Sequence, residues 1–228
     1  MKYYRILLLL YVPVFISACT RPAESSEMVE ADYVQYHIRY LEERAGDIPT
    51  NVLPSTMDAY YTRHFVLTRI EGFLNQFSLT QIANLKTKEV FTLLNFLGNK
   101  IYCITESGEL PASIMPINEM QFLYKTDTMS IGGLKSHRVE VVTDHTKYSI
   151  YYSRQIDVKR PNITTPYHSI NYVLTDFRIQ LSHLKMHLTC INHERLETDA
   201  GLFLIPEDYR AVSKQTMEKI INSLFTKD

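Results

Sequence analysis

The stretch Tyr172–Cys190, YVLTDFRIQLSHLKMHLTC, alternates apolar and polar side chains along almost its whole length. One side of it carries Val173, Thr175, Phe177, Ile179 and Leu181 and then Leu184, Met186, Leu188 and Cys190. A period of two is typical of β-strands with one buried face. We therefore expect two neighbouring strands here, joined as a hairpin around Ser182 and His183.

The same alternation recurs over much of the chain. Phe122–Ile131 and Leu134–Val142 flank Gly132-Gly133, a pair that supplies the positive φ angles of a tight hairpin turn. Asp144–Lys147 then turns the chain into Tyr148–Ser153. Further strands are expected at Val34–Tyr40, Phe65–Ile70, Phe73–Leu79 and Lys100–Thr105. Short connections between successive strands indicate an antiparallel meander.

Two segments have helical spacing instead. Ser213 precedes a stripe formed by Met217, Ile220, Ile221 and Leu224, which predicts a capped helix lying against a sheet. A second helix is expected over Lys88–Leu97, where Val90, Leu93, Leu94 and Leu97 form a similar stripe before Gly98. The sequence thus predicts an α+β fold, with one large curved antiparallel β-sheet and a few covering helices.

The N-terminus reads as an export signal. Ile6–Ile16 is apolar and follows Lys2 and Arg5, but it is shorter than the roughly 20 residues that span a bilayer. The sequence Ile16-Ser17-Ala18-Cys19 that closes it resembles the bacterial lipobox. The resemblance implies lipidation of Cys19 and cleavage before it. The alternative is an ordinary signal peptide cut near Ala18, which leaves Cys19 as an unpaired thiol.

These observations divide the chain into a signal peptide over residues 1–18, a lipidated tether over 19–31 and a single β-rich domain over 32–228. The lipid implies a membrane partner in the cell envelope. Thr20-Arg21-Pro22 lacks the Asp that is associated with inner-membrane retention in some bacteria, so the outer membrane is expected. Whether the protein faces the periplasm or the cell surface is left open.

Charge excludes one class of partner. Cleavage after Ala18 removes Lys2 and Arg5 and no acid, which leaves 22 basic and 25 acidic residues. A net charge of −3 supplies no strong field for nucleic acid, so no nucleic-acid partner is expected. The remaining 210 residues can form one sizeable core.

Two motifs carry a resemblance to a known fold. Asp127–Val142 (DTMSIGGLKSHRVEVV) and Phe203–Tyr209 (FLIPEDY) resemble strands of secreted bacterial domains with the half-barrel fold of the Lol lipoprotein carrier and receptor. The resemblance implies an incomplete barrel of antiparallel strands with a helical lid and a cavity for acyl chains. The basic residue and the protruding hydrophobic loop of a working carrier or receptor are not identifiable in the sequence.

Three function classes follow. The first is a binding module for a lipid or other hydrophobic ligand on the concave face of the sheet. Its walls would be formed by Val139, Val141, Ile150, Tyr152, Phe177, Ile179, Leu184, Met186 and Leu188, although the same rows could fill a solid core. The second is an adaptor lipoprotein that docks on an envelope protein complex. The third is an enzyme, which is not expected because the sequence has no G-x-S-x-G elbow, no H-E-x-x-H motif, no P-loop and no Rossmann glycine pattern.

The remaining chemistry-bearing residues suggest no catalytic site, metal site or cofactor. His183, His187 and His193 would face one ion together only on a helix, whereas four residues of a strand span roughly 13 Å. Cys103 and Cys190 could form a disulfide in an exported chain, or stay as buried free thiols.

Overall fold

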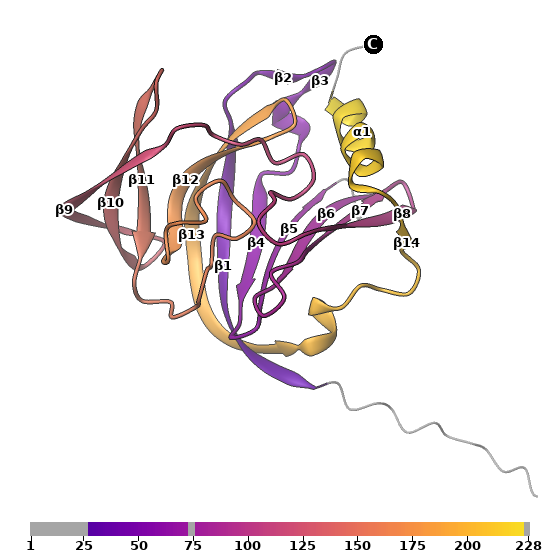
Figure 1. Ribbon diagram of the computed structural model, residues 1–228, viewed down its shortest axis with the longest axis horizontal. Coiled ribbons are helices and arrows are strands. Elements are labelled where there is room, and N and C mark those ends of the chain that lie inside the picture. Colours follow the sequence, from indigo (N-terminus) through magenta and orange to yellow (C-terminus); the bar gives the residue numbers. More distant parts are fainter. Residues whose placement is uncertain (1–26, 73–75, 226–228) are drawn as a thin grey trace, which may run out of the picture.

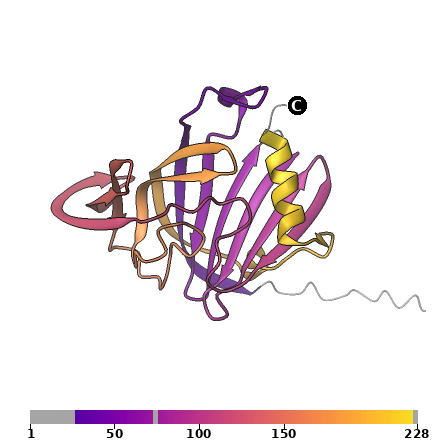
Figure 2. The ribbon, with the colours of Figure 1, turned by 45° about the horizontal axis from the view of Figure 1, so that its top comes forward.

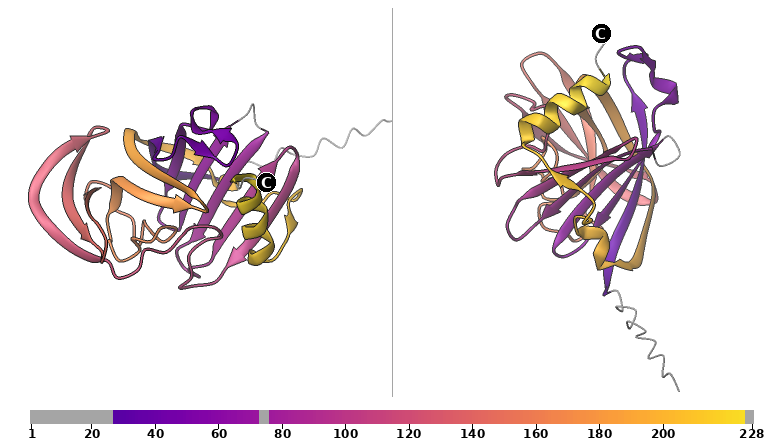
Figure 3. Two further views of the ribbon diagram at one scale, coloured as in Figure 1. Left: turned by 90° about the horizontal axis from the view of Figure 1, so that it is seen from above. Right: turned by 90° about the vertical axis from the view of Figure 1, so that its right-hand side faces the viewer.

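The computed structural model describes residues 27–72 and 76–225. Within them the chain forms a twelve-stranded sheet with the strand order β14-β8-β7-β6-β5-β4-β1-β13-β12-β11-β10-β9. Figure 1 shows the sheet curving strongly, and Figures 2 and 3 show helix α1 (Lys214–Phe225) lying across its concave side near one end. The fold is therefore α+β and dominated by the sheet, as the sequence predicted.

The strands are β1 (Met28–Tyr40), β4 (Thr56–Tyr61), β5 (Phe65–Gly72), β6 (Phe77–Asn84), β7 (Val90–Phe96), β8 (Asn99–Thr105), β9 (Gln121–Ile131), β10 (Leu134–Val142), β11 (Lys147–Ser153), β12 (Val173–Leu181), β13 (Leu184–Asp199) and β14 (Arg210–Ala211). Two-residue strands β2 (Arg44–Ala45) and β3 (Ile48–Pro49) form a separate ladder, and 3-10 helices η1 (Thr50–Val52) and η2 (Ala200–Phe203) complete the elements.

Strand β1 lies in the middle of the sheet. It pairs along its whole length with β13, from Met28 opposite Asp199 to Tyr40 opposite Met186, and pairs with β4 on its other side. The strands β4 to β8 continue the sheet on the β4 side, and β12 to β9 continue it beyond β13. All neighbours are antiparallel except β14 and β8. The meander expected from short connections is thus the main organising rule of the fold.

The two expected hairpins are confirmed. Gly132 and Gly133 have φ angles of 56° and 81° between β9 and β10, and Ser182 has a φ of 53° between β12 and β13. Residues 127–142, the first motif of the half-barrel resemblance, lie in the β9–β10 hairpin as expected. The glycine pair therefore located the first hairpin correctly, and the alternation of the flanking strands located the second.

The helix expected over Lys88–Leu97 is wrong, because Val90–Phe96 is strand β7. Both faces of this strand are covered. Val90 and Leu94 face the main core, while Leu93 packs in a second cluster with Phe203 on the other face of the sheet. A strand buried on both faces loses the period of two, so its apolar spacing imitated a helix.

Other strands also differ from the bounds expected from the sequence. Phe203–Tyr209, expected as a strand, is the end of η2 and an irregular connection that crosses the sheet toward β14. The strand expected over Phe73–Leu79 begins at Phe77 and continues to Asn84, and residues 73–75 lie outside the described residues. Strand β4 was not among the strands expected from the sequence.

The C-terminal helix is confirmed. The Ser213 hydroxyl accepts a hydrogen bond from the Thr216 backbone N–H at 3.1 Å, which caps α1. Met217, Ile221 and Phe225 are buried against the concave side of the sheet. None of the helices in the described part of the chain is long and apolar enough to cross a membrane.

Candidate functional site

The nine residues predicted as cavity walls all belong to the main core. They are Val139, Val141, Ile150, Tyr152, Phe177, Ile179, Leu184, Met186 and Leu188, and none is more than 9% exposed. Most of them therefore fill the core between the sheet and the segments that cover its concave side. Phe177, Ile179, Leu184 and Met186 also border small enclosed spaces.

The first of these spaces, called here the apolar pocket, has a volume of about 70 Å³. It lies between the end of α1, the segment 48–54 and the β12–β13 hairpin. Its lining consists of Tyr40, Ile48, Leu53, Pro54, Ile70, Phe77, Phe96, Leu181, Leu184, Met186, Leu224 and Phe225. The single hydroxyl among these side chains, that of Tyr40, donates to the Pro54 carbonyl at 2.7 Å. The pocket thus presents an apolar surface.

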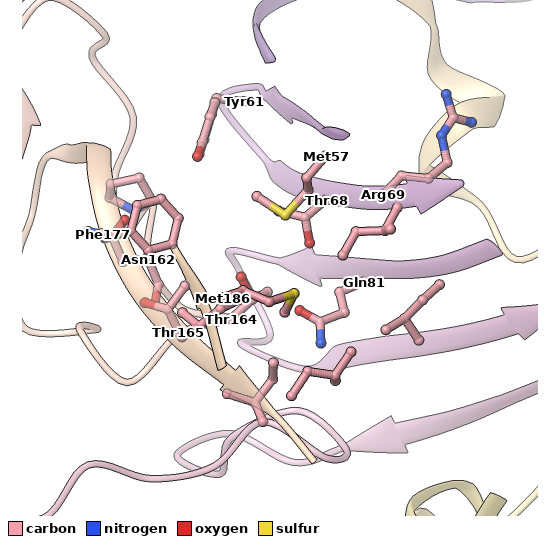
Figure 4. Close-up of a pocket in the computed structure, with 16 residues that line it drawn as sticks. Met57, Tyr61, Thr68, Arg69, Gln81, Asn162, Thr164, Thr165, Phe177 and Met186 are labelled. Atoms are coloured by element: carbon pink, nitrogen blue, oxygen red, sulfur yellow. The ribbon is translucent and has the colours of Figure 1, made fainter. Parts of the chain in front are cut away.

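The second space has a volume of about 40 Å³ and is drawn in Figure 4. Most of its lining is apolar, but it is called here the polar pocket because the Thr68 hydroxyl and the Gln81 amide also line it. Strands β4, β5, β6, β12 and β13 and the connection 161–165 surround it. In Figure 4 the Thr68 hydroxyl, the Gln81 amide and the Met186 thioether turn toward one space, whereas the Arg69 guanidinium turns away. Arg69 is paired with Glu71 at 3.4 Å. The polar pocket therefore offers neutral hydrogen-bonding groups.

One wall separates the two pockets. Ile70, Leu181 and Met186 line both of them. Methionine is unbranched and has three rotatable side-chain bonds, so it adapts to a changing cavity more readily than its two neighbours. Met186 is thus the most adaptable side chain of the wall between the apolar and polar pockets.

A buried row of polar side chains extends from the polar pocket across the sheet. Thr68, Gln81, Thr92 and Cys103 are successive cross-strand partners on β5, β6, β7 and β8. Gln81 is 6% exposed and Thr92 is fully buried. Burial raises the pKa of the Cys103 thiol to about 11. Buried polar groups cost free energy unless they find partners, and Thr92 and Cys103 lie opposite one another within this row.

Two buried tyrosines close the polar pocket on the β1 side. The Tyr36 hydroxyl donates to the Leu174 carbonyl at 2.7 Å and lies 3.1 Å from the hydroxyl of Tyr61, which lines the pocket. Burial raises the pKa of Tyr61 to about 12 and that of Tyr36 well above its ordinary value. Both phenols are therefore neutral hydrogen-bonding groups at physiological pH.

The histidines are separate from this site. His187 lies 2.8 Å from Asp176, and His193 lies 2.9 Å from Asp32, both on β13, while His183 is exposed in the hairpin turn. Among residues 27–72 and 76–225 no group of His, Cys, Asp and Glu side chains is arranged to hold a metal ion.

Cys103 and Cys190 are free and buried, so the disulfide that the sequence left open does not form between them. Burial raises the pKa of each thiol to about 11. Because the thiolate is the nucleophile, both cysteines are unreactive at neutral pH.

The predicted lipidation site, Cys19, lies outside the described residues, as do the signal peptide and most of the tether. Strand β1 begins at Met28, before the domain start expected at residue 32. The sheet thus begins nine residues after Cys19.

The sequence missed much of the site. The apolar pocket includes Ile48 and Leu53 from a segment without periodicity, and Phe225 from the last turn of α1. Gln81 does share one face with Leu79 and Ala83, and this interruption of an apolar row was the available signal for the polar row.

Comparisons with known proteins show the fold alone. No family model matches the chain, and no curated protein matches it either. Two crystal structures of PNGF-II, in space groups C2 and P21, match with TM-scores of 0.53 and 0.51, each at 12% sequence identity. They cover 84% and 86% of this chain but 32% and 33% of PNGF-II. The chain therefore spans about one third of the length of these structural neighbours.

Proposed function

We propose that this protein is a membrane-anchored lipoprotein of the cell envelope that binds a hydrophobic ligand with one polar end. The observation that carries the proposal is the pairing of an apolar pocket with a polar pocket across the shared wall of Ile70, Leu181 and Met186. The apolar part of the ligand would occupy the apolar pocket. Its polar end would meet Thr68 and Gln81.

Binding requires the concave side to open. The two pockets hold about 70 and 40 Å³, whereas small-molecule sites hold roughly 300 to 1,000 Å³. Leu224 and Phe225, at the end of α1, cover the apolar pocket. Helix α1 has twelve residues and follows the two-residue strand β14, which pairs only with β8, so α1 can move with little loss of sheet pairing. It would act as the lid that the half-barrel resemblance implies.

The test is native mass spectrometry with lipid extraction. The chain Thr20–Asp228, exported to a periplasm and purified without detergent, should carry a lipid or hydrophobic metabolite in stoichiometric amount. Ile48→Asp places a carboxylate at the apolar pocket and should remove that ligand. Val52→Asp is the matched control, because Val52 lies on the same segment and is 54% exposed against 36% for Ile48, yet does not line the pocket.

A clean mass without ligand would contradict the proposal if the folded chain also fails to bind the apolar fluorophore N-phenyl-1-naphthylamine. Gln81→Leu tests the polar end separately. We expect this variant to keep the fluorophore, which is apolar, but to bind the native ligand more weakly by roughly tenfold, the effect of one lost hydrogen bond of about 1.4 kcal/mol.

An adaptor role is the second candidate, and strand β9 favours it. This strand forms an open edge of the sheet and exposes Leu123, Tyr124 and Met129. Exposed edges can pair with a strand of another chain. A photo-cross-linking residue at Leu123 should then capture a single envelope protein in cells, whereas the same residue at the exposed Leu97 should capture none. Equal labelling from both positions would exclude β9 as a specific docking edge.

A further inference from the structure

The end of the sheet at which β1 begins carries an open cleft of about 630 Å³. Its lining includes Arg63 on the β4–β5 turn, Lys86 on the β6–β7 turn and Lys159. A neighbouring hollow of about 410 Å³ is lined by Lys88 and Arg160, which lie on the same two connections as Lys86 and Lys159. We call Arg63, Lys86, Lys88, Lys159 and Arg160 the basic rim.

The charges of the basic rim are unpaired. Within residues 27–72 and 76–225, none of the five side chains makes an ion pair or a hydrogen bond. Cations elsewhere in the fold are commonly paired: Lys100 contacts Asp208, Lys147 contacts Glu140 and Lys214 contacts Glu109. The five rim cations are therefore free to meet an external anion.

Nearby acids do not cancel this charge. Asp32 lines the cleft but is held by His193 at 2.9 Å and Arg195 at 3.7 Å. Glu109 lines the hollow and is paired with Lys214 at 2.7 Å. Glu30 and Asp157 remain in the lining, with Glu89 on the turn beside Lys88. The rim is thus locally positive on a chain whose formal net charge is −1.

Apolar side chains are exposed at the same end of the sheet. Met28, the first residue of β1, is 52% exposed, and Leu204, directly after η2, is 64% exposed. Met28 pairs with Asp199, the residue before η2, so the two lie on one corner of the fold. In Figure 1 this corner is the lower end of the molecule. Basic and apolar side chains together are the composition that binds the interface of an anionic membrane.

The proposed anchor places this end near a bilayer. Cys19 lies nine residues before Met28, and nine extended residues reach at most roughly 30 Å. We propose that the basic rim docks the domain onto the anionic lipid headgroups of the membrane that holds it, with Leu204 and Met28 in the interface. This inference rests on the proposed lipid anchor. It leaves the apolar pocket, at the other end of the sheet, facing away from the membrane.

The test uses the full lipidated chain on vesicles of phosphatidylcholine, with or without about one third phosphatidylglycerol. Amine-reactive labelling read by mass spectrometry reports the exposure of each lysine. On anionic vesicles the labelling of Lys86, Lys88 and Lys159 should fall by roughly threefold or more relative to neutral vesicles, and about 0.5 M NaCl should restore it. Lys185 and Lys219, outside the rim, should label equally on both vesicles.

Variants separate charge from apolar contact. Lys86→Glu with Lys159→Glu should abolish the protection of Lys88, whereas Lys185→Glu with Lys219→Glu should not. Leu204→Asp should weaken the protection, and Leu97→Asp, with a comparable exposure of 67% against 64%, should leave it unchanged.

Equal labelling of the rim on both vesicles, or a fall that includes Lys185 and Lys219, would overturn the proposal. Failure of the anchor is seen independently, because flotation with neutral vesicles depends on the lipid alone. If the chain does not float with neutral vesicles, salt-sensitive flotation with anionic vesicles still supports docking through the basic rim. If the chain does not float with anionic vesicles either, docking through the basic rim is refuted.

Discussion

At the scale of single residues, the β9–β10 turn shows how closely backbone and side chain are fitted. Gly132 has a φ of 56°, and a Cβ atom added there would lie 2.3 Å from the Cys190 sulfur and 2.9 Å from the Cys190 carbonyl oxygen. Gly133 has a φ of 81°, but a Cβ atom there would meet nothing within 4 Å. The first glycine is required by packing as well as by conformation, and the second by conformation alone.

These two glycines give a matched pair of substitutions. Gly133→Ala should cost about 1 to 2 kcal/mol, the usual cost of a left-handed conformation for an L-residue. Gly132→Ala should cost more, by roughly 2 kcal/mol or more, because the turn must also move away from Cys190. Urea unfolding of both variants measures the difference. Equal losses would show that the turn can shift freely on β13.

The buried thiols predict a loss of stability in alkali. Burial raises the pKa of Cys103 and Cys190 from 9.0 to about 11 and that of Tyr61 from 10.0 to about 12. The folded state therefore holds these protons more tightly than the unfolded state does. Their contribution to stability is complete below the unfolded pKa values and is lost as the pH rises through the folded ones.

We expect the urea midpoint to fall steadily above a pH of about 9. Replacement of Cys103 and Cys190 by Ala removes two of the titrating groups, so the double variant should lose less stability between pH values of about 8 and 11, even if it is less stable at neutral pH. Parallel pH profiles for the variant and the natural chain would refute this assignment.

At the scale of elements, helix α1 depends on its cap. The Ser213 hydroxyl accepts from the Thr216 N–H, whereas the Ser223 hydroxyl only donates back to the Ile220 carbonyl on an exposed turn. Ser213→Ala should destabilise α1 by about 1 kcal/mol, and Ser223→Ala should change its stability by less than half of that. Amide hydrogen exchange across residues 214–225 distinguishes the two. Similar exchange in both variants would show that packing alone holds α1.

The sequence predictions were correct for strands with one polar face and wrong for a strand that is buried on both faces. Strands β12 and β13 have one polar face, so their alternation located them and the turn at Ser182. Strand β7 is covered on both faces, by the main core and by the η2 connection, and it was mistaken for a helix. The segment that places Ile48 at the apolar pocket has no period of either kind. For β7 and for the segment that contains Ile48, the structure depends on what packs against the segment in the folded chain, which the local sequence pattern does not show.

At the scale of the whole molecule, stability should decrease from the middle of the sheet to its free edge. Strands β1 and β13 share a long ladder and carry fully buried side chains such as Val34 and Leu188. Strand β9 pairs on one side only and is exposed along most of its length. Native-state hydrogen exchange should therefore release β9 amides first and the central amides of β1 and β13 last.

Uniform protection over β9, β1 and β13 would contradict this ordering. A selective gain of protection in β9 on adding an envelope extract would instead identify the edge as occupied, which is the outcome expected of the adaptor role.

The whole-molecule arrangement could be anticipated only in part. The curved sheet and its C-terminal helix followed from local patterns. Phe177, Ile179, Leu184 and Met186, which the alternation assigned to one apolar face, are buried and border the two pockets. The basic rim could not be anticipated, because Arg63, Lys86 and Lys159 are far apart in the sequence and meet only when three connections converge.

The position of β1 has a mechanical consequence. The chain enters the fold at Met28, in a strand with neighbours on both sides, and not in an edge strand. A pull on the N-terminal segment along the axis of β1 loads its hydrogen bonds to β13 from Met28 onward and those to β4 from Asp32 onward, all in shear. With the proposed lipid anchor, traction from the membrane would be carried by the long ladder of β1 and β13 and not by α1 or the residues of the two pockets at the far end.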